Sequence, residues 1–333
     1  MIKSSAPTRI DLAGGTLDIW PLHLFFGNAP TLNAAIDLYA TVEIIPRKDK
    51  RIVLRSRDLN LEDSFSSLTA LPDNHPLELI TRTLKFYAPK SGLEISTSCQ
   101  APQGSGIGGS SALNIALHGA LNKFTGKKYS KQEMIEIARN IETQVIRVPA
   151  GSQDYFPAMY GGVRSVNPGF LGIDTETLAI KPKELTRHMI LCYTGKPRNS
   201  GINNWEITKK ALDGDKKVIR HLGTIRDCTL EMHQLLKKGR ISGIAPIFSR
   251  EWKARKQLAP TITTPQMDKL IRSALNKGAL AAKVCGAGGG GCVAFIVPPG
   301  KKQLIISELN LKGGKVLPFQ FVSRGQKASH QKQ

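Results

Sequence analysis

The most informative part of the sequence for the fold is Pro102-Gln103-Gly104-Ser105-Gly106-Ile107-Gly108-Gly109-Ser110-Ser111-Ala112. It follows an alternating segment, residues 93–98, that predicts a strand, and it leads into an apolar helical run from Ser110 to about Phe124. A strand, a glycine-rich turn and a helix in this order form an anion site, because backbone N–H groups and the positive end of the helix dipole converge there. Glycines allow a phosphate to approach the backbone and permit positive φ angles.

The glycine spacing alone leaves the kind of loop open. Gly104, Gly106 and Gly109 match the G-x-G-x-x-G pattern of dinucleotide-binding folds, but the acidic residue expected about 20 positions later is replaced by Lys127-Lys128-Tyr129. The sequence contains no G-x-x-x-x-G-K-[ST], which excludes an ordinary P-loop. A glycine triplet by itself is as consistent with a structural turn as with a ligand site.

Periodicity on either side of the loop indicates mixed α and β structure. The predicted strands cover residues 36–45, 51–56, 93–98, 188–193 and 292–297. The predicted helices cover residues 110–124, 204–238 and 241–277, and a further helix starts after Ser130. Ser130 followed by Glu133 forms a capping box, and Pro260 and Pro265 are expected to interrupt the last helical region.

At 333 residues the chain is long enough for two domains, each with its own core. We expect an N-terminal domain over residues 1–168, a C-terminal domain over 169–325 and a frayed polar tail over 326–333. The boundary is placed to within some ten residues.

The composition, 41% hydrophobic and 22% charged residues, is typical of a folded protein. The sequence has neither the roughly 20 consecutive apolar residues of a membrane-spanning helix nor a secretion signal, so we expect a cytoplasmic protein without a membrane partner. The five cysteines show no metal-ligand spacing and are expected to be reduced.

A formal net charge of +21 would attract polyanions, including nucleic acid and phosphorylated metabolites. The basic residues are spread along the chain without regular aromatic interleaving. We therefore expect a small-molecule partner rather than nucleic acid, and leave a homodimer open.

The loop resembles the P-x-x-x-G-L-G-S-S-A motif of the GHMP kinases, which include galactokinase and the homoserine, mevalonate and phosphomevalonate kinases. Residues 6–15 and 283–291 resemble the family's other two signatures, in the right order and across nearly the whole chain. The resemblance implies an α+β fold of two domains: an N-terminal domain with the phosphate loop and a C-terminal antiparallel sheet with helices. The active site is then expected in the cleft between them.

The resemblance also implies ATP and Mg²⁺ as cofactors. The residues expected to bind ATP are Pro102, Gly104, Ser105, Gly106, Ile107, Gly108, Gly109, Ser110 and Ser111. Ser110 and Glu142 map to the metal ligands of the family, and a hydroxyl with a carboxylate suits Mg²⁺. The residues alone leave open that Ser110 is a helix cap and Glu142 a surface carboxylate.

Two residues are expected to be catalytic. Ala150-Gly151-Ser152-Gln153-Asp154 resembles the family's G-x-x-D segment, which makes Asp154 the candidate general base. In the family a cation lies beside that carboxylate, and Arg9 occupies the matching position in the first motif. The alternatives are a turn aspartate satisfied by backbone N–H groups and a structural salt bridge.

The residues expected to contact substrate are Asp18, Thr16, Gly151, Gly288 and Gly289. Within the family, the chain resembles the heptose-7-phosphate kinase and fucokinase branch, which carries A-G-G-G-T-D and G-G-x-Q-D-Q. It differs by Thr16-Leu17 in place of Gly-Thr and by Tyr155 in place of the last Gln. If the substrate already carries a phosphate, the candidate cations are Arg147, Lys196, Arg198 and Lys283.

The expected function is transfer of a phosphoryl group from ATP to a hydroxyl of a sugar or sugar phosphate. The alternatives are a mevalonate-type or other small-alcohol kinase, a related ATP-dependent decarboxylase, and a nucleotide-binding regulator without turnover.

Overall fold

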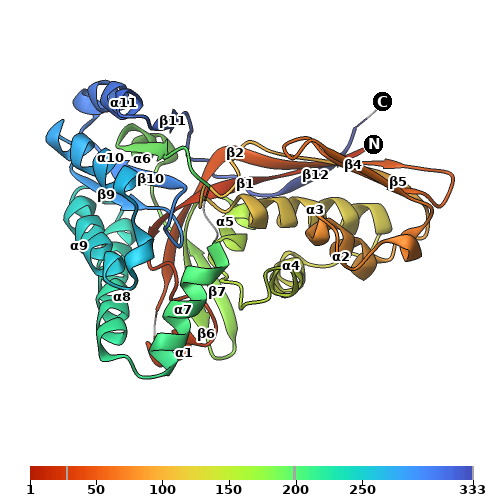
Figure 1. Ribbon diagram of the computed structural model, residues 1–333, viewed down its shortest axis with the longest axis horizontal. Coiled ribbons are helices and arrows are strands. Elements are labelled where there is room, and N and C mark those ends of the chain that lie inside the picture. Colours follow the sequence, from red (N-terminus) through yellow and green to blue (C-terminus); the bar gives the residue numbers. More distant parts are fainter. Residues whose placement is uncertain (28, 198–199, 332–333) are drawn as a thin grey trace.

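Two lobes, joined by two long strands, make up the molecule (Figure 1). The computed structural model describes residues 1–27, 29–197 and 200–331, without the side chains of residues 200–203. The joining strands are β1 (Ile2–Ala13) and β2 (Thr31–Pro46), which pair antiparallel with Arg9 opposite Ala35. The predicted two-domain α+β fold is confirmed.

The first lobe is built on an eight-stranded sheet in the order β12-β1-β2-β5-β3-β4, with β6 paired to β2 and β7 to β6. The other strands of this sheet are β3 (Ile52–Ser56), β4 (Leu61–Phe65), β5 (Leu93–Cys99), β6 (Val163–Gly169), β7 (Gly172–Thr177) and β12 (Lys327–His330). The pairing of β3 with β5 is parallel, whereas the neighbouring pairs are antiparallel.

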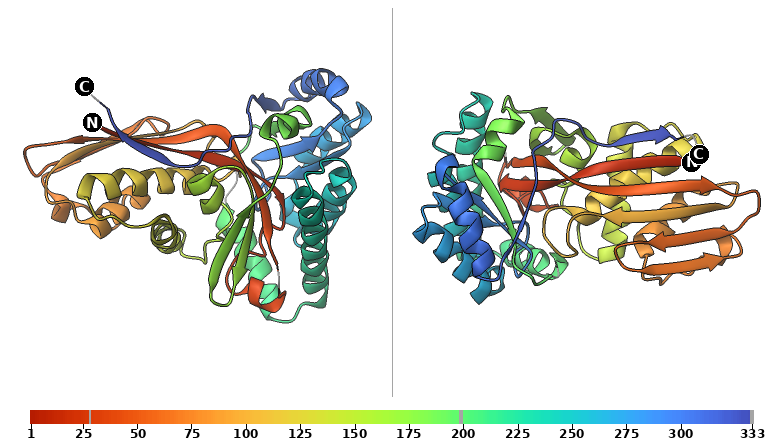
Figure 2. Two further views of the ribbon diagram at one scale, coloured as in Figure 1. Left: turned by 180° about the vertical axis from the view of Figure 1, so that it is seen from behind. Right: turned by 90° about the horizontal axis from the view of Figure 1, so that it is seen from above.

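Helices cover one face of this sheet, and the view from above shows its other face (Figure 2). These helices are α2 (Glu78–Tyr87), α3 (Gly109–Thr125), α4 (Lys131–Ile146) and α5 (Tyr155–Tyr160). The buried residues of α3, including Ile115 and Leu121, pack against Val42 and Ile44 of β2 in one apolar core. The side chains of β4 alternate between exposed and partly buried positions, as expected where one face of a sheet meets solvent.

The second lobe contains a four-stranded antiparallel sheet in the order β11-β8-β10-β9. Its strands are β8 (Met189–Tyr193), β9 (Ala281–Val284), β10 (Cys292–Ile296) and β11 (Lys315–Leu317). The helices of this lobe are α6 (Pro182–Arg187), α7 (Ser200–Leu212), α8 (Lys216–Lys237), α9 (Ile244–Lys256), α10 (Pro265–Asn276) and α11 (Lys302–Leu311). Short elements complete the chain: α1 (Leu22–Phe25) and the 3-10 turns Leu68–Ala70, Pro260–Ile262 and Pro299–Lys301.

Alternate residues of the second sheet enter two different cores. Val293 and Phe295 of β10 pack with α10 and α11, whereas Ala294 packs with Ile10 of β1 and Leu32 of β2. The second of these cores therefore contains side chains from both lobes. Because it is continuous, it fixes the lobes relative to each other and thereby fixes the walls of the space between them.

Local sequence signals set the helix ends. The capping box is confirmed: Ser130 Oγ accepts from Glu133 N, and Glu133 Oε2 accepts from Ser130 N. The helical region predicted over 204–238 is divided at Gly214, which has a φ of +82°, before Asp215 caps α8. Pro265 occupies the first turn of α10, so the predicted interruption also occurs.

Two pairings were not expected from the sequence. Residue 168 lies inside β6, and its hairpin partner β7 extends the first sheet to Thr177. The chain end, expected to fray, instead forms β12, which pairs with the first residues of β1 from Ile2 to Ser5. The edge of β1 would otherwise present unpaired N–H and C=O groups, and β12 satisfies them. None of the helices in the described ranges is both long and apolar enough to cross a membrane.

Candidate active site

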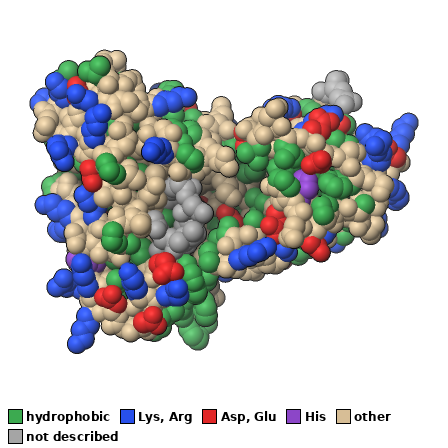
Figure 3. Space-filling view, in the orientation of Figure 1, with side chains coloured by type: hydrophobic (Ala, Val, Ile, Leu, Met, Phe, Trp, Pro, Cys, Tyr) green, Lys and Arg blue, Asp and Glu red, His purple; other side chains and the backbone are tan. Residues whose placement is uncertain are grey.

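A cleft of about 770 Å³ lies between the lobes and is lined from both. Figure 3 shows the surface hollowed there, with Lys and Arg side chains scattered over both lobes. The walls come from the loop after β5, the end of α4, the segment before α5 and the loop after β1. The polar and charged residues of the lining are Arg9, Thr16, Asp18, Asp58, Gln103, Ser105, Ser110, Ser111, Glu142, Gln153, Asp154, Tyr155 and Asn204.

The glycine-rich loop bends sharply before α3 begins. Gly104, Gly106 and Gly108 have φ angles of +64°, +78° and +75°, in the left-handed region that favours glycine. Gly108 is the N-cap of α3 and offers no side chain to cover the first amides of the helix. The loop and the positive end of the helix therefore face the cleft as an anion site.

Three consecutive carbonyl groups hold this loop in place. Ser105 O accepts from Cys292 N at 2.7 Å, Gly106 O from Arg9 Nη1 at 2.8 Å, and Ile107 O from Arg9 N at 2.9 Å. The side chain of Ile107 is fully buried in the core shared by the lobes and does not line the cleft. Ile107 was expected to bind the nucleotide, but it is not among the residues that line the cleft.

Glu142 lies opposite the first turn of α3. Its Oε1 accepts from Ser110 Oγ at 3.0 Å and its Oε2 from Ser111 Oγ at 3.2 Å, and the hydroxyl of Tyr155 also donates to Oε2. Glu142 is only 8% exposed, and burial raises its pKa. It is therefore not a surface carboxylate, and Ser110 is not the helix cap, because Gly108 holds that position.

The oxygens around Glu142 suit a hard cation. Among the residues that the structure describes, no group of three or more His, Cys, Asp or Glu side chains could hold a metal. A Mg²⁺ ion at Ser110 and Glu142 would consequently take its remaining ligands from phosphate oxygens and water.

Arg9 and Asp154 form an ion pair beside the glycine loop. Asp154 Oδ1 accepts from Arg9 Nε at 2.8 Å, and the Asp154 side chain makes no cap at the start of α5. Burial alone would lower the pKa of Arg9, but the carboxylates of Asp154 and Asp11 raise it, so the guanidinium stays charged. A methyl group added at Gly108 would lie 3.4 Å from Cγ of Asp154, which places the carboxylate next to the anion site.

Asp18 reaches the same cleft from the loop after β1. Its Oδ2 accepts from the backbone N–H groups of Ser152 and Gln153 at 2.6 and 2.9 Å, while its buried Oδ1 has no protein partner within the described chain. Burial raises the pKa of Asp18 to about 6. Gly151 packs directly against this carboxylate, and a side chain there would collide with Oδ2.

Thr16, two residues earlier, also lines the cleft. Its hydroxyl donates to Asn204 Oδ1 of α7 at 3.2 Å and accepts from Arg255 Nη1 of α9 at 3.3 Å. The loop of residues 14–18 in the first lobe is thus held by helices of the second lobe.

The third glycine-rich segment, residues 286–291, supports the phosphate loop. Gly291 packs so closely that a methyl group there would lie 2.6 Å from Ser105 O. Gly286 and Ala287 line the cleft. Gly288 and Gly289, which were expected to contact substrate, are not among the lining residues and instead pack on Ile262, whose carbonyl accepts from Gly289 N at 2.9 Å.

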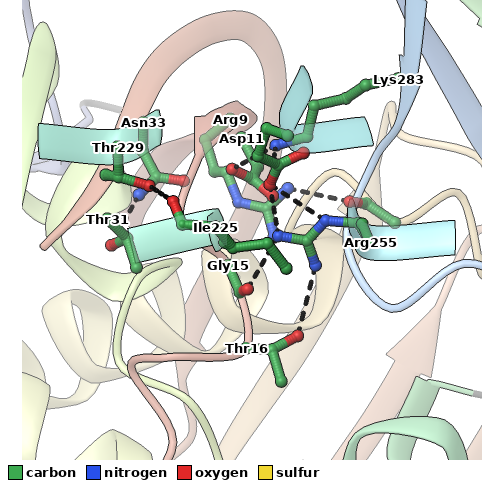
Figure 4. A network of polar contacts seen from close by, with 12 residues as sticks. Arg9, Asp11, Gly15, Thr16, Thr31, Asn33, Ile225, Thr229, Arg255 and Lys283 are labelled. Atoms are coloured by element: carbon green, nitrogen blue, oxygen red, sulfur yellow. Dashed lines mark hydrogen bonds and ion pairs between the residues drawn. The ribbon is translucent and has the colours of Figure 1, made fainter. Parts of the chain in front are cut away.

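A buried charged network lies behind the cleft (Figure 4). Lys283 Nζ contacts Asp11 Oδ1 at 3.2 Å and Glu251 Oε1 at 3.0 Å, and Arg255 Nη2 contacts the same Glu251 oxygen at 2.6 Å. All four side chains are at most 2% exposed. Burial of a carboxylate opposes its ionisation, but Lys283, Arg255 and Arg9 lower the pKa of Asp11.

Because of this network, one of the four cations considered for binding a substrate phosphate is not available. Lys283 is fully buried and already paired with two carboxylates, so it is not an available cation. Arg147 and Lys196 are exposed and do not line the cleft. Arg198 lies outside the described residues.

Glu251, Arg255 and Asn204 were not predicted from the sequence as site residues. Each belongs to a helix of the second lobe whose pattern predicts only an ordinary amphipathic surface helix. A glutamate followed four residues later by an arginine is typical of a solvent-exposed helical pair. The neighbouring sequence therefore does not show that the Glu251–Arg255 pair is buried. Tyr155 was noted only as a departure from the family motif, and its hydroxyl contact with Glu142 required the fold.

The two lobes, the anion loop at a helix N-terminus and the adjacent Arg9–Asp154 pair define a small-molecule phosphotransferase. Residues 76–162 match the GHMP kinases N terminal domain, and residues 232–315 match the GHMP kinases C terminal domain. The chain belongs to the GHMP kinases, which use ATP as phosphate donor.

Several relatives match the chain over nearly its full length. The D-glycero-alpha-D-manno-heptose 7-phosphate kinase of Campylobacter jejuni is 28% identical over 98% of both chains. The crystal structure of a D-glycero-D-manno-heptose 1-phosphate kinase from Bacteroides thetaiotaomicron matches with a TM-score of 0.82, at 25% identity over 100% of both chains. The Lactococcus lactis galactokinase complexed with galactose has a TM-score of 0.80 over 98% of this chain and 95% of its own, and at 18% identity it shows the fold alone.

Proposed function

We propose that the protein transfers the γ-phosphoryl group of ATP to a hydroxyl of a sugar phosphate of the heptose type. The observation that carries this proposal is the position of the Asp154 carboxylate, which is bonded to Arg9 and lies beside the N-terminus of α3. The names of the two heptose phosphate kinases among the relatives support the choice of acceptor class.

The glycine loop would hold the phosphates of ATP through its amides and those at the start of α3. Ser110 and Glu142 would hold Mg²⁺, which neutralises phosphate charge when bound. Tyr155 and Ser111 both donate to Oε2 of Glu142, and these contacts fix the direction of the carboxylate. Fixed oxygens are what a cation with strict octahedral geometry requires.

Asp154 would act as general base. The acceptor hydroxyl oxygen attacks the γ-phosphorus while its proton passes to Asp154, and the bond to the bridging oxygen breaks as ADP leaves. Arg9, held by the carbonyl of Gly106, would keep the carboxylate oriented and counter charge on the transferred group. Asp18, with its unpaired Oδ1, would accept hydrogen bonds from acceptor hydroxyl groups.

An ADP-release screen tests this proposal. The acceptors are D-glycero-D-manno-heptose 7-phosphate, the 1-phosphate of the same sugar, galactose, fucose and mevalonate, each supplied with ATP and Mg²⁺. We expect ADP with a heptose phosphate, and a new phosphate ester in the ³¹P NMR spectrum of the product. ADP formation with mevalonate alone would contradict the sugar assignment, and release of CO₂ alongside ADP would identify a decarboxylase instead.

A further inference from the structure

Thr16 adopts a backbone conformation that its residue type disfavours. Its φ is +82°, in the left-handed region, where a β-branched side chain is a steric outlier. The resemblance to the A-G-G-G-T-D motif places a glycine at this position. Residues kept in such conformations are held by surrounding structure and are concentrated at functional sites.

Arg255 makes much of the contact that holds the loop of residues 14–18. Its Nη2 donates to Gly15 O at 2.8 Å and its Nη1 to Thr16 Oγ1 at 3.3 Å, as Figure 4 shows. The guanidinium is 2% exposed and reaches the loop from α9, 240 residues further along the chain than Gly15. One planar group therefore binds the backbone and the side chain of neighbouring residues at the acceptor end of the cleft.

On the side away from the loop, the guanidinium of Arg255 is held by an ion pair with Glu251. Glu251 Oε1 accepts from Nε at 3.1 Å and Nη2 at 2.6 Å, and the same oxygen contacts Lys283 Nζ. Lys283 in turn pairs with Asp11, two residues from Arg9 on β1. The carboxylate of Asp11 also lies directly beneath Gly15, since a methyl group there would be 2.6 Å from its Oδ2.

We propose that Arg255 is a positioning residue of the acceptor site, which acts by holding Gly15 and the strained Thr16 so that Thr16 and Asp18 present a fixed surface to the acceptor. This inference rests on the proposed kinase function and adds a specificity element to it. Arg255 does not line the cleft, so it acts through the loop and not by touching substrate. The proposed site for ATP lies at the start of α3, and none of the hydrogen bonds that Arg255 makes reaches that site.

The test compares KM values for acceptor and for ATP in four variants. Arg255→Lys keeps the buried charge but loses the fork that contacts two residues at once. Thr16→Gly removes both the side chain and the strain, and the double variant combines Arg255→Lys with Thr16→Gly. Lys253→Met, at an exposed position on the same helix, is the control. Heptose 7-phosphate and galactose serve as acceptor probes, since they differ in size and charge.

We expect Arg255→Lys and Thr16→Gly each to raise the KM for the better acceptor about tenfold, the loss of one charged hydrogen bond, while the KM for ATP stays within about twofold. The double variant should be no worse than the poorer single variant, because both changes release the same loop. Lys253→Met should resemble the wild type.

Three results would overturn the inference. These are unchanged acceptor KM in both Arg255→Lys and Thr16→Gly, an equal rise in the KM for ATP, and additive effects in the double variant. If Arg255→Lys does not fold, the KM values of Thr16→Gly for acceptor and for ATP are the test of the inference. Thermal melting shows, without any acceptor, whether each variant is folded. A wild type that phosphorylates only mevalonate would end the sugar assignment, and the KM comparison would then be made with mevalonate.

Discussion

Asp154 Oδ1 accepts hydrogen bonds from both Nε and Nη2 of Arg9, at 2.8 and 2.5 Å, although 145 residues separate the two along the chain. The arginine side chain is 2% exposed, while that of the aspartate is 24% exposed. The pair therefore has a buried cation and a carboxylate that reaches the cleft. This asymmetry suits a base that must meet an incoming hydroxyl.

The first prediction concerns that carboxylate. Asp154→Asn keeps the shape and can still accept from Arg9, but an amide cannot take the acceptor proton. We expect kcat to fall by about 10³-fold with little change in the affinity for ATP. ADP release and binding of a non-hydrolysable ATP analogue measure the two quantities. Asp174→Asn, at an exposed position of β7, is the matched control, and unchanged turnover in Asp154→Asn would remove Asp154 from the mechanism.

The second prediction concerns the metal. Glu142→Gln removes the negative oxygen expected to hold Mg²⁺, and Tyr155→Phe removes only the hydroxyl that orients it. We expect the Mg²⁺ concentration for half-maximal activity to rise about 100-fold in Glu142→Gln and about 10-fold in Tyr155→Phe. Isothermal titration of Mn²⁺ into protein saturated with an ATP analogue gives a second reading. EDTA should abolish turnover in the wild type, and Mg²⁺ dependence unaltered by both changes would place the ion elsewhere.

The third prediction separates backbone strain from crowding at Gly291. Gly291 and Gly214 have φ angles of +85° and +82°, but a methyl group at Gly291 meets Ser105 O at 2.6 Å, whereas one at Gly214 meets nothing within 4 Å. Alanine at Gly214 should cost about 1 kcal/mol of unfolding free energy, from strain alone. Alanine at Gly291 should cost about 3 kcal/mol or more, because the contact with the phosphate loop must also open.

Urea denaturation followed by circular dichroism measures both costs. ATP-analogue affinity should fall only in the Gly291 variant, since Ser105 belongs to the phosphate loop. Equal destabilisation by the two changes would show that the packing of residues 286–291 on that loop contributes nothing.

The fourth prediction follows from Asp18, whose pKa burial raises to about 6. The folded protein binds this proton more tightly than the unfolded chain, so the contribution of Asp18 to stability increases as pH falls from about 6 to about 4 and is lost as pH rises above 6. Asp18→Asn should remove this pH dependence, which amounts to about 3 kcal/mol of unfolding free energy. The difference in unfolding free energy between wild type and Asp18→Asn, measured at pH 4 and pH 7, gives the sign and size.

The same group should shape the activity profile. Acceptor kcat/KM is expected to decline below pH 6, as the carboxylate that accepts sugar hydroxyl hydrogens becomes protonated. Acceptor kcat/KM of the Asp18→Asn variant should be low at all pH values and should not decline further below pH 6. An acid limb of equal steepness in the variant would assign the titration to a different group.

Local chemistry made much of the fold predictable. The strand, glycine loop and helix around residues 93–125 are encoded by alternation, by glycines that tolerate φ angles near +75° and by an apolar run. The capping box at Ser130 and Glu133 and the break at Pro265 are likewise set by neighbouring residues. The hairpin of β6 and β7 was not predicted, because Pro168 and two glycines in its sequence resemble a loop.

Contiguous motifs encode the family, the phosphate loop and the residue types able to do the chemistry, so these could be predicted from the amino-acid sequence. Which charged groups are available to a ligand depends instead on the three-dimensional fold. It buried Lys283 between two carboxylates, brought Arg255 of α9 beneath Thr16, and paired the end of the chain with β1. Burial and ion pairing depend on residues hundreds of positions apart, and helical or strand periodicity carries no information about which distant side chain will meet a given charge.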